Sequence, residues 1–228
     1  MKLKIDLHIH TNFSYDSQND IEEIIKVAKQ KGLDGVGLVD HDTTSGFSEM
    51  IRLGKEKDIV VIPGVEIRVK GGYLLAYGNV TELPPKGTTP ESAIFILQKQ
   101  DVLIAAVHPF KNGLGLKNHI YDLKLDALET ANGGAIFGDK PAEKAAEKLG
   151  LPRIGGSDEH FLSDIGSVVT TIETPSKSAK DILNAIKRGD ATITQDKSVL
   201  RIIWFYIKKG FMKLIGCFHV EKQIDFSC

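Results

Sequence analysis

The pattern of hydrophobic and polar positions divides this chain into short apolar runs separated by segments of helical periodicity. Apolar runs typical of strands cover residues 2–10, 35–39, 58–65, 73–77, 102–107, 125–130, 152–156, 167–173 and 191–194. Helical periodicity covers residues 21–31, 45–57, 90–99, 141–149 and 179–187. Because near-continuous apolar strands that alternate with helices are typical of a parallel sheet covered on both faces, the pattern predicts an α/β fold.

Residues at the helix ends support this division. Asp20 is predicted to cap the first helix, and Gly32 is predicted to end it. Thr44 or Ser45 is predicted to cap the second helix, and Pro90 suits the first position of the third. The predicted helices therefore begin soon after the ends of the predicted strands.

Histidine and carboxylate side chains follow many of the predicted strands. His8 and His10 stand one residue apart at the end of the first strand, so their side chains are expected to project from one face. Asp158 and His160 repeat this spacing after a later strand. The whole set comprises His8, His10, His41, Glu66, His108, Asp158 and His160, with Asp16 on the loop after the first pair. Because polar groups at the carboxyl ends of many strands converge only when the sheet closes, we predict a barrel with its site at that rim.

This set of side chains predicts a metal centre. Five of the seven histidines of the chain belong to it, and crowded imidazoles and carboxylates are costly without a cation. Mixed ligands of this kind suit Zn²⁺, Mn²⁺ or Fe²⁺. The donors are too many for one tetrahedral ion, so we expect two or three ions with Glu66 as a bridging carboxylate. Such a centre can polarise a phosphoryl oxygen, lower the pKa of a water and neutralise a leaving group, which predicts phosphoester hydrolysis.

Length and composition place these residues in an ordinary globular protein. The chain has 228 residues, 42% hydrophobic and 26% charged, and its net charge of −1 gives no general basic field for nucleic acid. This length suits one undivided barrel, and the two cysteines, Cys217 and Cys228, form no disulfide framework. No apolar run reaches the roughly 20 residues that span a bilayer, and the first strand begins too early for a signal peptide. We therefore expect a cytoplasmic protein.

Five ordered motifs resemble the PHP (polymerase and histidinol phosphatase) family. They are Asp6-Leu7-His8-x-His10-Thr11, Val39-Asp40-His41-Asp42, Pro63-Gly64-Val65-Glu66, Val107-His108-Pro109 and Gly156-Ser157-Asp158-x-His160. The resemblance covers residues 1–194 and implies a distorted seven-stranded (β/α) barrel with two or three metal ions at its C-terminal rim. It implies that the eight residues of the set are ligands, that Glu66 bridges two ions and that a metal-bound hydroxide is the nucleophile. Within the set, Glu66, Asp158 and His160 are the predicted catalytic residues.

Two positions depart from the pattern of the family or leave a choice open. Many three-metal members carry a histidine a few residues after the bridging glutamate, and Tyr73 stands there in this chain. One metal position is therefore expected to be empty, weakly held, or completed by the phenol or a water. In the first loop, Asp20 competes with Asp16 as the ligand.

Other polar residues are candidates for supporting the site or binding substrate. Asp40 and Asp42 flank His41 and are predicted either to orient it or to form a turn. Residues that could donate to a phosphate are Thr11 and Ser14 by their hydroxyls, and Arg68, Lys70, Lys111 and Arg153 by their charge, with Arg68 and Lys111 favoured. Glu129 and Asn132 are predicted to line the pocket.

The last part of the chain has a different character. We predict that residues 1–195 form the barrel and that residues 196–228 form a basic amphipathic extension. Between residues 198 and 220 there is no acidic residue, and apolar side chains recur with helical period. The extension either packs on the barrel or a second subunit, or lies on an anionic membrane surface or nucleic acid. Residues 199–207 would also suit a strand.

Together these observations predict a metal-dependent phosphoesterase. Its expected substrate is a small phosphorylated metabolite, nucleotide-like in the sense of a nucleoside bisphosphate or the end of a short oligonucleotide, without a stable nucleic-acid complex. Two alternatives remain open from the sequence. One is a histidinol-phosphate-type phosphatase, and the other is a non-catalytic accessory barrel that binds RNA or a polymerase partner.

Overall fold

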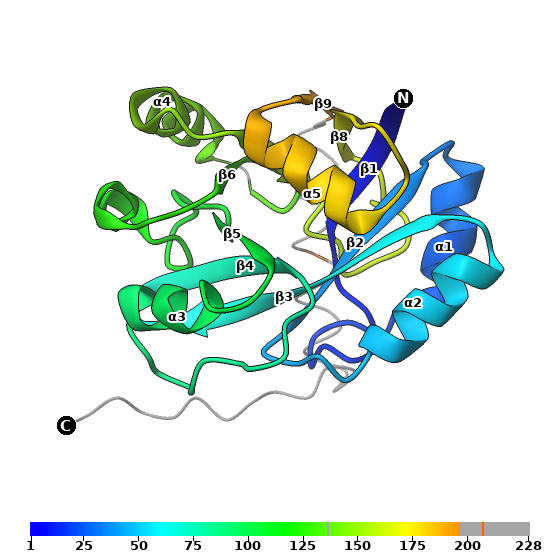
Figure 1. Ribbon diagram of the computed structural model, residues 1–228, viewed down its shortest axis with the longest axis horizontal. Helices are drawn as coiled ribbons and strands as arrows, with labels where there is room; N and C mark the ends of the chain where they lie inside the picture. The colour runs from blue at the N-terminus through cyan, green and yellow to red at the C-terminus, as the bar shows by residue number, and fades with distance from the viewer. Residues whose placement is uncertain (136, 197–206, 208–228) are drawn as a thin grey trace.

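A nine-stranded sheet forms the centre of the fold, with helices around it (Figure 1). The computed structural model describes residues 1–135, 137–196 and 207. Its strands are β1 (Lys2–Ile9), β2 (Gly35–His41), β3 (Val60–Val69), β4 (Gly72–Gly78), β5 (Val102–Ala106), β6 (Ala127–Asn132), β7 (Arg153–Gly156), β8 (Val168–Glu173) and β9 (Ala191–Gln195). Its helices are α1 (Ile21–Gln30), α2 (Phe47–Glu56), α3 (Pro90–Leu97), α4 (Asp139–Leu149) and α5 (Ala179–Arg188), with a 3₁₀ helix η1 (Lys117–Asp122). The predicted α/β class is confirmed.

The sheet curls into a nearly closed barrel. Its strand order is β7-β6-β5-β4-β3-β2-β1-β8-β9, with β1–β3 parallel, β5–β7 parallel, and β4 and β8 antiparallel to their neighbours. The chain that leaves β7 returns to β1, where Ile9 forms a bridge with Glu159 and the Ser157 N–H donates to Asp6 Oδ1. The predicted distorted barrel is therefore confirmed. It has nine strands rather than seven because β8 and β9 add an antiparallel pair beyond β1.

Helix α5 covers one end of the barrel interior. Ile182 and Ile186 of α5 belong to the same buried cluster as Ile5, Ile62 and Leu103, which come from three different strands. Two further apolar clusters lie between the outer face of the sheet and the other helices. Burial of apolar surface on both faces of the sheet therefore stabilises the barrel.

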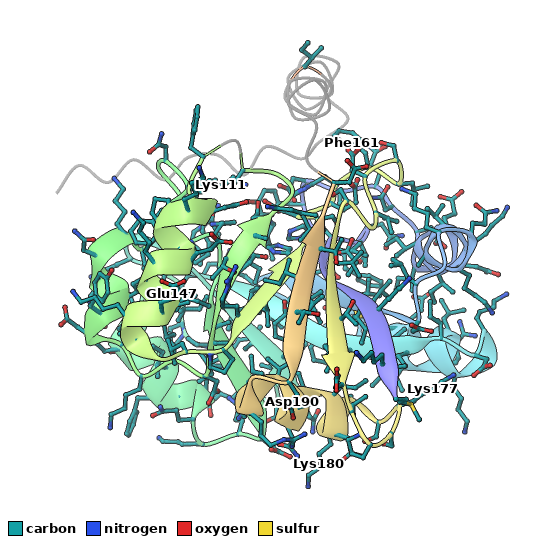
Figure 2. The ribbon with its side chains drawn as sticks, turned by 90° about the horizontal axis from the view of Figure 1, so that it is seen from above. Lys111, Glu147, Phe161, Lys177, Lys180 and Asp190 are labelled. Atoms are coloured by element: carbon teal, nitrogen blue, oxygen red, sulfur yellow. The ribbon has the colours of Figure 1, made fainter. Side chains whose placement is uncertain are left out.

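The opposite end of the barrel carries the loops that follow the parallel strands. Figure 2 shows Lys111 and Phe161 at this upper end, whereas Lys180 and Asp190, at the two ends of α5, lie at the lower end. Strands β1, β2, β5 and β7 run in the same direction, so the polar residues that follow them meet at the upper end, opposite α5.

A β-bulge in β1 turns His8 into the barrel. Alternate residues of β1 as far as Leu7 belong to the interior cluster, so a regular strand would point His8 outward. The register of β1 against β2 shifts between Asp6 and Ile9, and Ile9 packs outside the barrel in the cluster that includes α1. The bulge therefore reverses the alternation and brings His8 to Glu66.

Left-handed backbone conformations aim two more polar side chains. His108, two residues after the end of β5, has φ 29°, and Asp158, two residues after the end of β7, has φ 54°. Non-glycine residues rarely adopt such angles, and each costs of order 1–3 kcal/mol. The His108 N–H is held by Glu129 Oε2 at 2.8 Å, a hydrogen bond that offsets part of this cost.

Strand β3 is longer than the sequence pattern predicts. We expected it to end at Glu66, but it continues to Val69 because it forms an antiparallel hairpin with β4, in which Arg68 pairs with Tyr73. Glu66 is thus inside a strand and not at its end. Its side chain points into the barrel because it alternates with the outward-facing Val65 and Ile67.

The predicted helix caps are mostly confirmed. The Asp20 carboxylate accepts from the Glu22 N–H at the start of α1, and Thr89 caps α3 with Pro90 in its first turn. The prediction for α2 is wrong, because this helix begins at Phe47, and its N-cap, Gly46, offers no side chain. The hydroxyl of Ser45, a predicted cap, instead accepts from Thr43.

The predicted C-terminal extension lies outside the described residues except for Asp196 and Ile207. We predicted that this extension packs on the barrel or a second subunit, lies on a membrane surface or nucleic acid, or forms a strand over residues 199–207. These alternatives, and the boundary at residue 195, therefore stay predictions. Within the described part of the chain, no helix is both long and apolar enough to cross a membrane.

Candidate metal centre

Glu66 lies in the middle of four imidazoles. Its side chain is 2% exposed. Glu66 Oε2 lies 3.4 Å from His8 Nε2 and 3.2 Å from His10 Nε2. The same oxygen lies 3.4 Å from His41 Nδ1, whereas Oε1 lies 3.2 Å from His108 Nε2. Both oxygens of one carboxylate thus face ring nitrogens, which is the arrangement expected of a carboxylate that bridges two cations.

Hydrogen bonds behind the rings of His8 and His10 determine which nitrogen of each neutral ring carries the proton. His8 Nδ1 lies 2.8 Å from Glu129 Oε1, and an ionised carboxylate only accepts, so Nδ1–H donates. Ser14 Oγ donates its one proton to Asp40 Oδ1 at 2.9 Å and therefore accepts from His10 Nδ1 at 3.2 Å. The two Nε2 atoms consequently present lone pairs to each other, at a distance of 3.1 Å.

This geometry fits a cation. Two nitrogen lone pairs at such a distance repel each other unless a proton or a cation lies near both. Asp158 Oδ1 completes the group, 3.5 Å from His8 Nε2 and 3.6 Å from His10 Nε2. Four donor atoms, from His8, His10, Glu66 and Asp158, lie within 4.8 Å of one another, and all four residues are buried. Two imidazoles and two carboxylates around one point suit a divalent ion such as Zn²⁺.

A second group of donors shares His10 with the first. It consists of His10, Asp16, His41 and His160, whose donor atoms also lie within 4.8 Å of one another. His160 Nδ1 donates to the Asp158 carbonyl oxygen at 3.0 Å, so in the neutral ring Nε2 presents its lone pair to Asp16 Oδ2, also at 3.0 Å. Of the two carboxylates considered for this loop, Asp16 lies with the imidazoles and Asp20 caps α1.

Burial and mutual attraction determine the proton affinities in the centre. Burial lowers the pKa of the His10 imidazole, but the Asp158 and Glu66 carboxylates outweigh burial and raise that pKa to about 9. Burial favours the neutral form of Asp16, yet the neighbouring His160 holds the pKa of that carboxyl well below its usual range. Without a cation the His10 imidazole therefore holds a proton at neutral pH, and a metal ion has to displace it.

His108 and Tyr73 lie beside the two donor groups. His108 faces Glu66 and is in neither group of the described residues. The Tyr73 ring lies between His41 and His108, at centroid distances of 5.8 and 6.1 Å. Burial raises the pKa of the Tyr73 phenol, which Arg68 partly counteracts, so the group stays protonated at neutral pH. A neutral phenol is a poorer cation ligand than an imidazole, and Tyr73 belongs to neither donor group of the described residues.

Lys111 is a cation in direct contact with the centre. Its Nζ lies 2.6 Å from Asp158 Oδ2, and its side chain is 13% exposed. Burial raises the pKa of Asp158, but Lys111 is the first of several charges that hold it well below its usual range. Gly134 packs so closely that a Cβ there would lie 2.8 Å from Asp158 Oδ2. The predicted substrate residue Lys111 is thus at the site.

Arg68 lies at the rim next to the second donor group. It follows Glu66 by two residues on β3, so both side chains are on the same face of the strand. Its Nη2 donates to the Tyr15 hydroxyl at 3.1 Å, and its guanidinium lies 5.4 Å from the centre of the Tyr73 ring. The Tyr15 ring in turn stacks on His41 at 4.9 Å. This contact extends the site from the metal donors to a positively charged rim.

The other predicted carboxylates hold backbone segments in place. Asp40 accepts from the Thr11 N–H, the Thr11 hydroxyl and the Ser14 hydroxyl, so it supports His10 through Ser14. The hydroxyls of Thr11 and Ser14, which we considered for phosphate binding, are directed to this carboxylate. Asp42, with φ 50°, accepts from the Arg68 N–H at 2.8 Å and so connects the ends of β2 and β3.

Two predicted cations lie away from the centre. Arg153 begins β7, at the end of that strand remote from Asp158, and pairs with Glu143 of α4. Lys70 lies in the turn between β3 and β4, where its N–H donates to the Thr88 carbonyl. Neither contacts the metal donors through a hydrogen bond or ion pair that the structure describes.

Sequence reasoning underestimated two buried carboxylates. Glu129 contacts His8, His108 and Asn132, although the sequence suggested only that it lines the pocket. Asp6 accepts N–H groups of residues 8, 157 and 166, which ties β1 to the loop after β7. Both lie within apolar runs, and Asp6 also belongs to the first of the five motifs, but neither signal indicates which groups these carboxylates contact.

Two family models match this chain in succession. The model of the PHP domain matches residues 6–137, and the model of the PHP-associated region matches residues 140–191. The chain belongs to the PHP family. The resemblance inferred from the five motifs is therefore confirmed, and this PHP protein places seven of its eight predicted ligands in the two donor groups, with His108 beside them.

Known proteins similar to this PHP protein include both uncharacterised and named relatives. Uncharacterized protein MJ1587 of Methanocaldococcus jannaschii is 36% identical over 143 residues, which cover 57% of this chain and 82% of that protein. A phosphoribosyl 1,2-cyclic phosphate 1,2-diphosphodiesterase of Eggerthella lenta is 32% identical over 62 residues, covering 27% of this chain and 23% of that enzyme. A two-domain protein of Bacteroides vulgatus that contains a predicted PHP-like metal-dependent phosphoesterase has the same fold, with a TM-score of 0.74 at 19% identity over 92% of this chain and 70% of its own.

Proposed function

We propose that this PHP protein is a metal-dependent phosphoesterase, which hydrolyses a phosphomonoester or phosphodiester bond of a small nucleotide-like metabolite. The observation that carries the proposal is the pair of four-donor groups that share His10. The family supports the enzyme class, a hydrolase of phosphoester bonds. The Eggerthella lenta relative is a diphosphodiesterase by name, and the Bacteroides vulgatus protein is described as containing a predicted metal-dependent phosphoesterase.

We propose that the two donor groups would hold two divalent cations, either Zn²⁺, Mn²⁺ or Fe²⁺. Ions held by such donors lower the pKa of water, polarise phosphoryl oxygens and neutralise a leaving group. Glu66 belongs to the first donor group and also faces His41 of the second, so it would contact both ions. Asp158 and His160, predicted as catalytic with Glu66, belong to different groups and would each hold one ion.

Lys111 adds a fixed positive charge beside these donors. Its ammonium contacts Asp158 Oδ2 and leaves Asp158 Oδ1 facing His8 and His10. A phosphoryl group bound at the donors would lie within reach of this ammonium. We assign Lys111 the role of binding a phosphoryl oxygen, because lysine binds phosphate as a mobile point charge.

Arg68 suits a second anionic group of the same substrate. Successive residues on one face of a strand are about 7 Å apart, so the guanidinium lies one such step further towards the rim than Glu66. A guanidinium binds phosphate by two parallel hydrogen bonds. A nucleoside bisphosphate or a short oligonucleotide end carries two phosphates at such a spacing, which supports a nucleotide-like substrate over a monophosphate such as histidinol phosphate.

The non-catalytic alternative would require loss of metal donors. Seven of the eight predicted ligands lie within the two donor groups, so an accessory role in binding RNA or a polymerase has no support from the site. We propose no stable complex with nucleic acid, and the cytoplasmic location stays a prediction from the sequence.

A substrate screen tests this proposal. Purified protein loaded with Mn²⁺, Zn²⁺ or Fe²⁺ is assayed for phosphate or nucleotide release from nucleoside bisphosphates, nucleoside monophosphates, histidinol phosphate and short oligonucleotides. We expect turnover of the bisphosphates or oligonucleotide ends, and its loss in His8→Ala and Asp158→Ala, which should remain folded by circular dichroism. Wild-type turnover in either variant, or no turnover of any phosphoester by the loaded protein, would contradict the proposal.

A further inference from the structure

Glu129 on β6 uses its three hydrogen bonds to connect residues from three strands or strand ends. The side chain is 1% exposed. Its Oε1 lies 2.8 Å from His8 Nδ1 of β1. Its Oε2 accepts the N–H of His108 at 2.8 Å and the side-chain amide of Asn132 at 2.9 Å. A buried carboxylate with these partners sits behind the metal donors and does not itself belong to either donor group.

The two oxygens of Glu129 have different kinds of partner, and this difference determines which nitrogen of His8 carries the proton. Two N–H groups converge on Oε2: the backbone N–H of His108, which can only donate, and the NH₂ group of the Asn132 side chain. The partner of Oε1 is an imidazole nitrogen, which donates or accepts according to its tautomer. With a carboxylate, which only accepts, His8 has to carry its proton on Nδ1. Its Nε2 lone pair then faces His10 and Glu66.

An amide in place of this carboxylate, as in the variant Glu129→Gln, would have one permitted orientation. Its carbonyl oxygen would take the place of Oε2, because two donors converge there. Its NH₂ group would then face His8 Nδ1 and donate to it. His8 would be driven to carry its proton on Nε2, which points into the donor group and opposes a cation.

We propose that Glu129 is a positioning residue that selects the Nδ1–H tautomer of His8 and thereby sets the metal affinity of the donor group of Glu66 and Asp158. The same carboxylate holds the backbone of His108 in its left-handed conformation. This inference rests on the metal centre of the proposed function, but it concerns the protonation of the His8 ring and not the substrate. It predicts an effect on one donor group, because His8 belongs to the first group and not to the second.

The variant Glu129→Gln tests the proposal, with Asp6→Asn as the matched control. Asp6 is also a fully buried carboxylate next to His8, but it accepts from the backbone N–H groups of residues 8, 157 and 166 and not from the His8 ring. Titration of Zn²⁺ into each protein against a competing chelator measures the affinity of both ions. We expect Glu129→Gln to lower the affinity for one Zn²⁺ ion by about 10- to 100-fold and to leave the affinity for the other ion nearly unchanged. Equal affinities in wild type and Glu129→Gln would overturn the proposal.

The tautomer itself is read by ¹⁵N NMR of the metal-free proteins, at a pH where the His8 ring is neutral. The wild type and Asp6→Asn should carry the proton on Nδ1, and Glu129→Gln on Nε2. A wild-type His8 with its proton on Nε2 would overturn the proposal even if Glu129→Gln failed to fold. These readouts also separate the two proposals. If the tautomer and the metal affinity change as expected but the wild type hydrolyses no phosphoester, only the proposed function is contradicted.

Discussion

The Nε2 atoms of His8 and His10 lie 3.1 Å apart, with each ring held from behind by an oxygen acceptor. Neutral rings in this arrangement direct two lone pairs at one point. The structure satisfies them in one of two ways, by a proton shared in the metal-free protein or by a cation. Competition between protons and cations for this point underlies the first prediction.

The stability of the metal-free protein should fall as the pH rises from about 6.5 to 9. The pKa of His10 is raised from 6.5 to about 9 in the folded chain. A raised pKa contributes stability that is complete below the unfolded value and is lost as the pH rises through the folded value. This shift corresponds to about 3 kcal/mol, since ten-fold in proton affinity is about 1.4 kcal/mol.

Urea unfolding of the chelator-treated protein between pH 5 and pH 9.5 measures this dependence. With saturating Zn²⁺ the trend should weaken or reverse, because the ion requires unprotonated imidazoles. At the acid end, the depressed pKa of Asp16 contributes stability that is lost as the pH falls below the ordinary aspartate range. A metal-free protein equally stable at pH 6 and pH 9 would contradict the description of His10.

Single histidine variants should remove different ions. His8 belongs only to the group of Glu66 and Asp158, His160 belongs only to the group of Asp16 and His41, and His10 belongs to both. We therefore expect His8→Ala and His160→Ala to retain about one ion per chain, and His10→Ala to retain fewer than either.

Elemental analysis after metal loading and gel filtration measures this stoichiometry. His119→Ala is the control, because His119 pairs with Glu91 on the surface. Full metal content in His10→Ala would show that the two groups do not share this residue.

Removal of the Lys111 charge should impair substrate binding and turnover. Charge-assisted hydrogen bonds contribute about 2–3 kcal/mol, so Lys111→Met should lower kcat/KM by about 30- to 150-fold. Because Asp158 also loses its ionic partner, metal content is measured alongside the rate. Lys148→Met is the control, since Lys148 lies over the Tyr121 ring. An unchanged kcat/KM in Lys111→Met would remove this residue from the site.

A methyl group at Gly156 should disturb His8. A Cβ at Gly156 would lie 2.3 Å from His8 Cβ and 2.4 Å from His8 N, so backbone has to move. Overpacking of this kind costs about 1–3 kcal/mol. We expect Gly156→Ala to lower the free energy of unfolding by at least that amount and to reduce metal content. Gly189→Ala, where φ is 84° with no heavy atom within 4 Å of the new methyl, should cost about 1 kcal/mol and leave metal binding intact.

Much of the fold and of the donor set is determined by the sequence alone. The apolar runs correspond to the strands, because each run has to bury its side chains inside or outside the sheet. The donors could be predicted because imidazoles and carboxylates at the ends of buried strands are costly to bury unless they bind a partner such as a cation. The end of β3 could not be named, since its extension past Glu66 depends on pairing with β4.

What only the tertiary structure decided is the direction of the donors and the groups behind them. The bulge between Asp6 and Ile9 and the left-handed angle at Asp158 change which way side chains point. These irregularities exist because the returning chain after β7 has to bond to β1, a contact between residues 151 positions apart. Local propensities carry no information on such a contact. For the same reason, the role of Glu129 becomes visible only when β6 lies against His8.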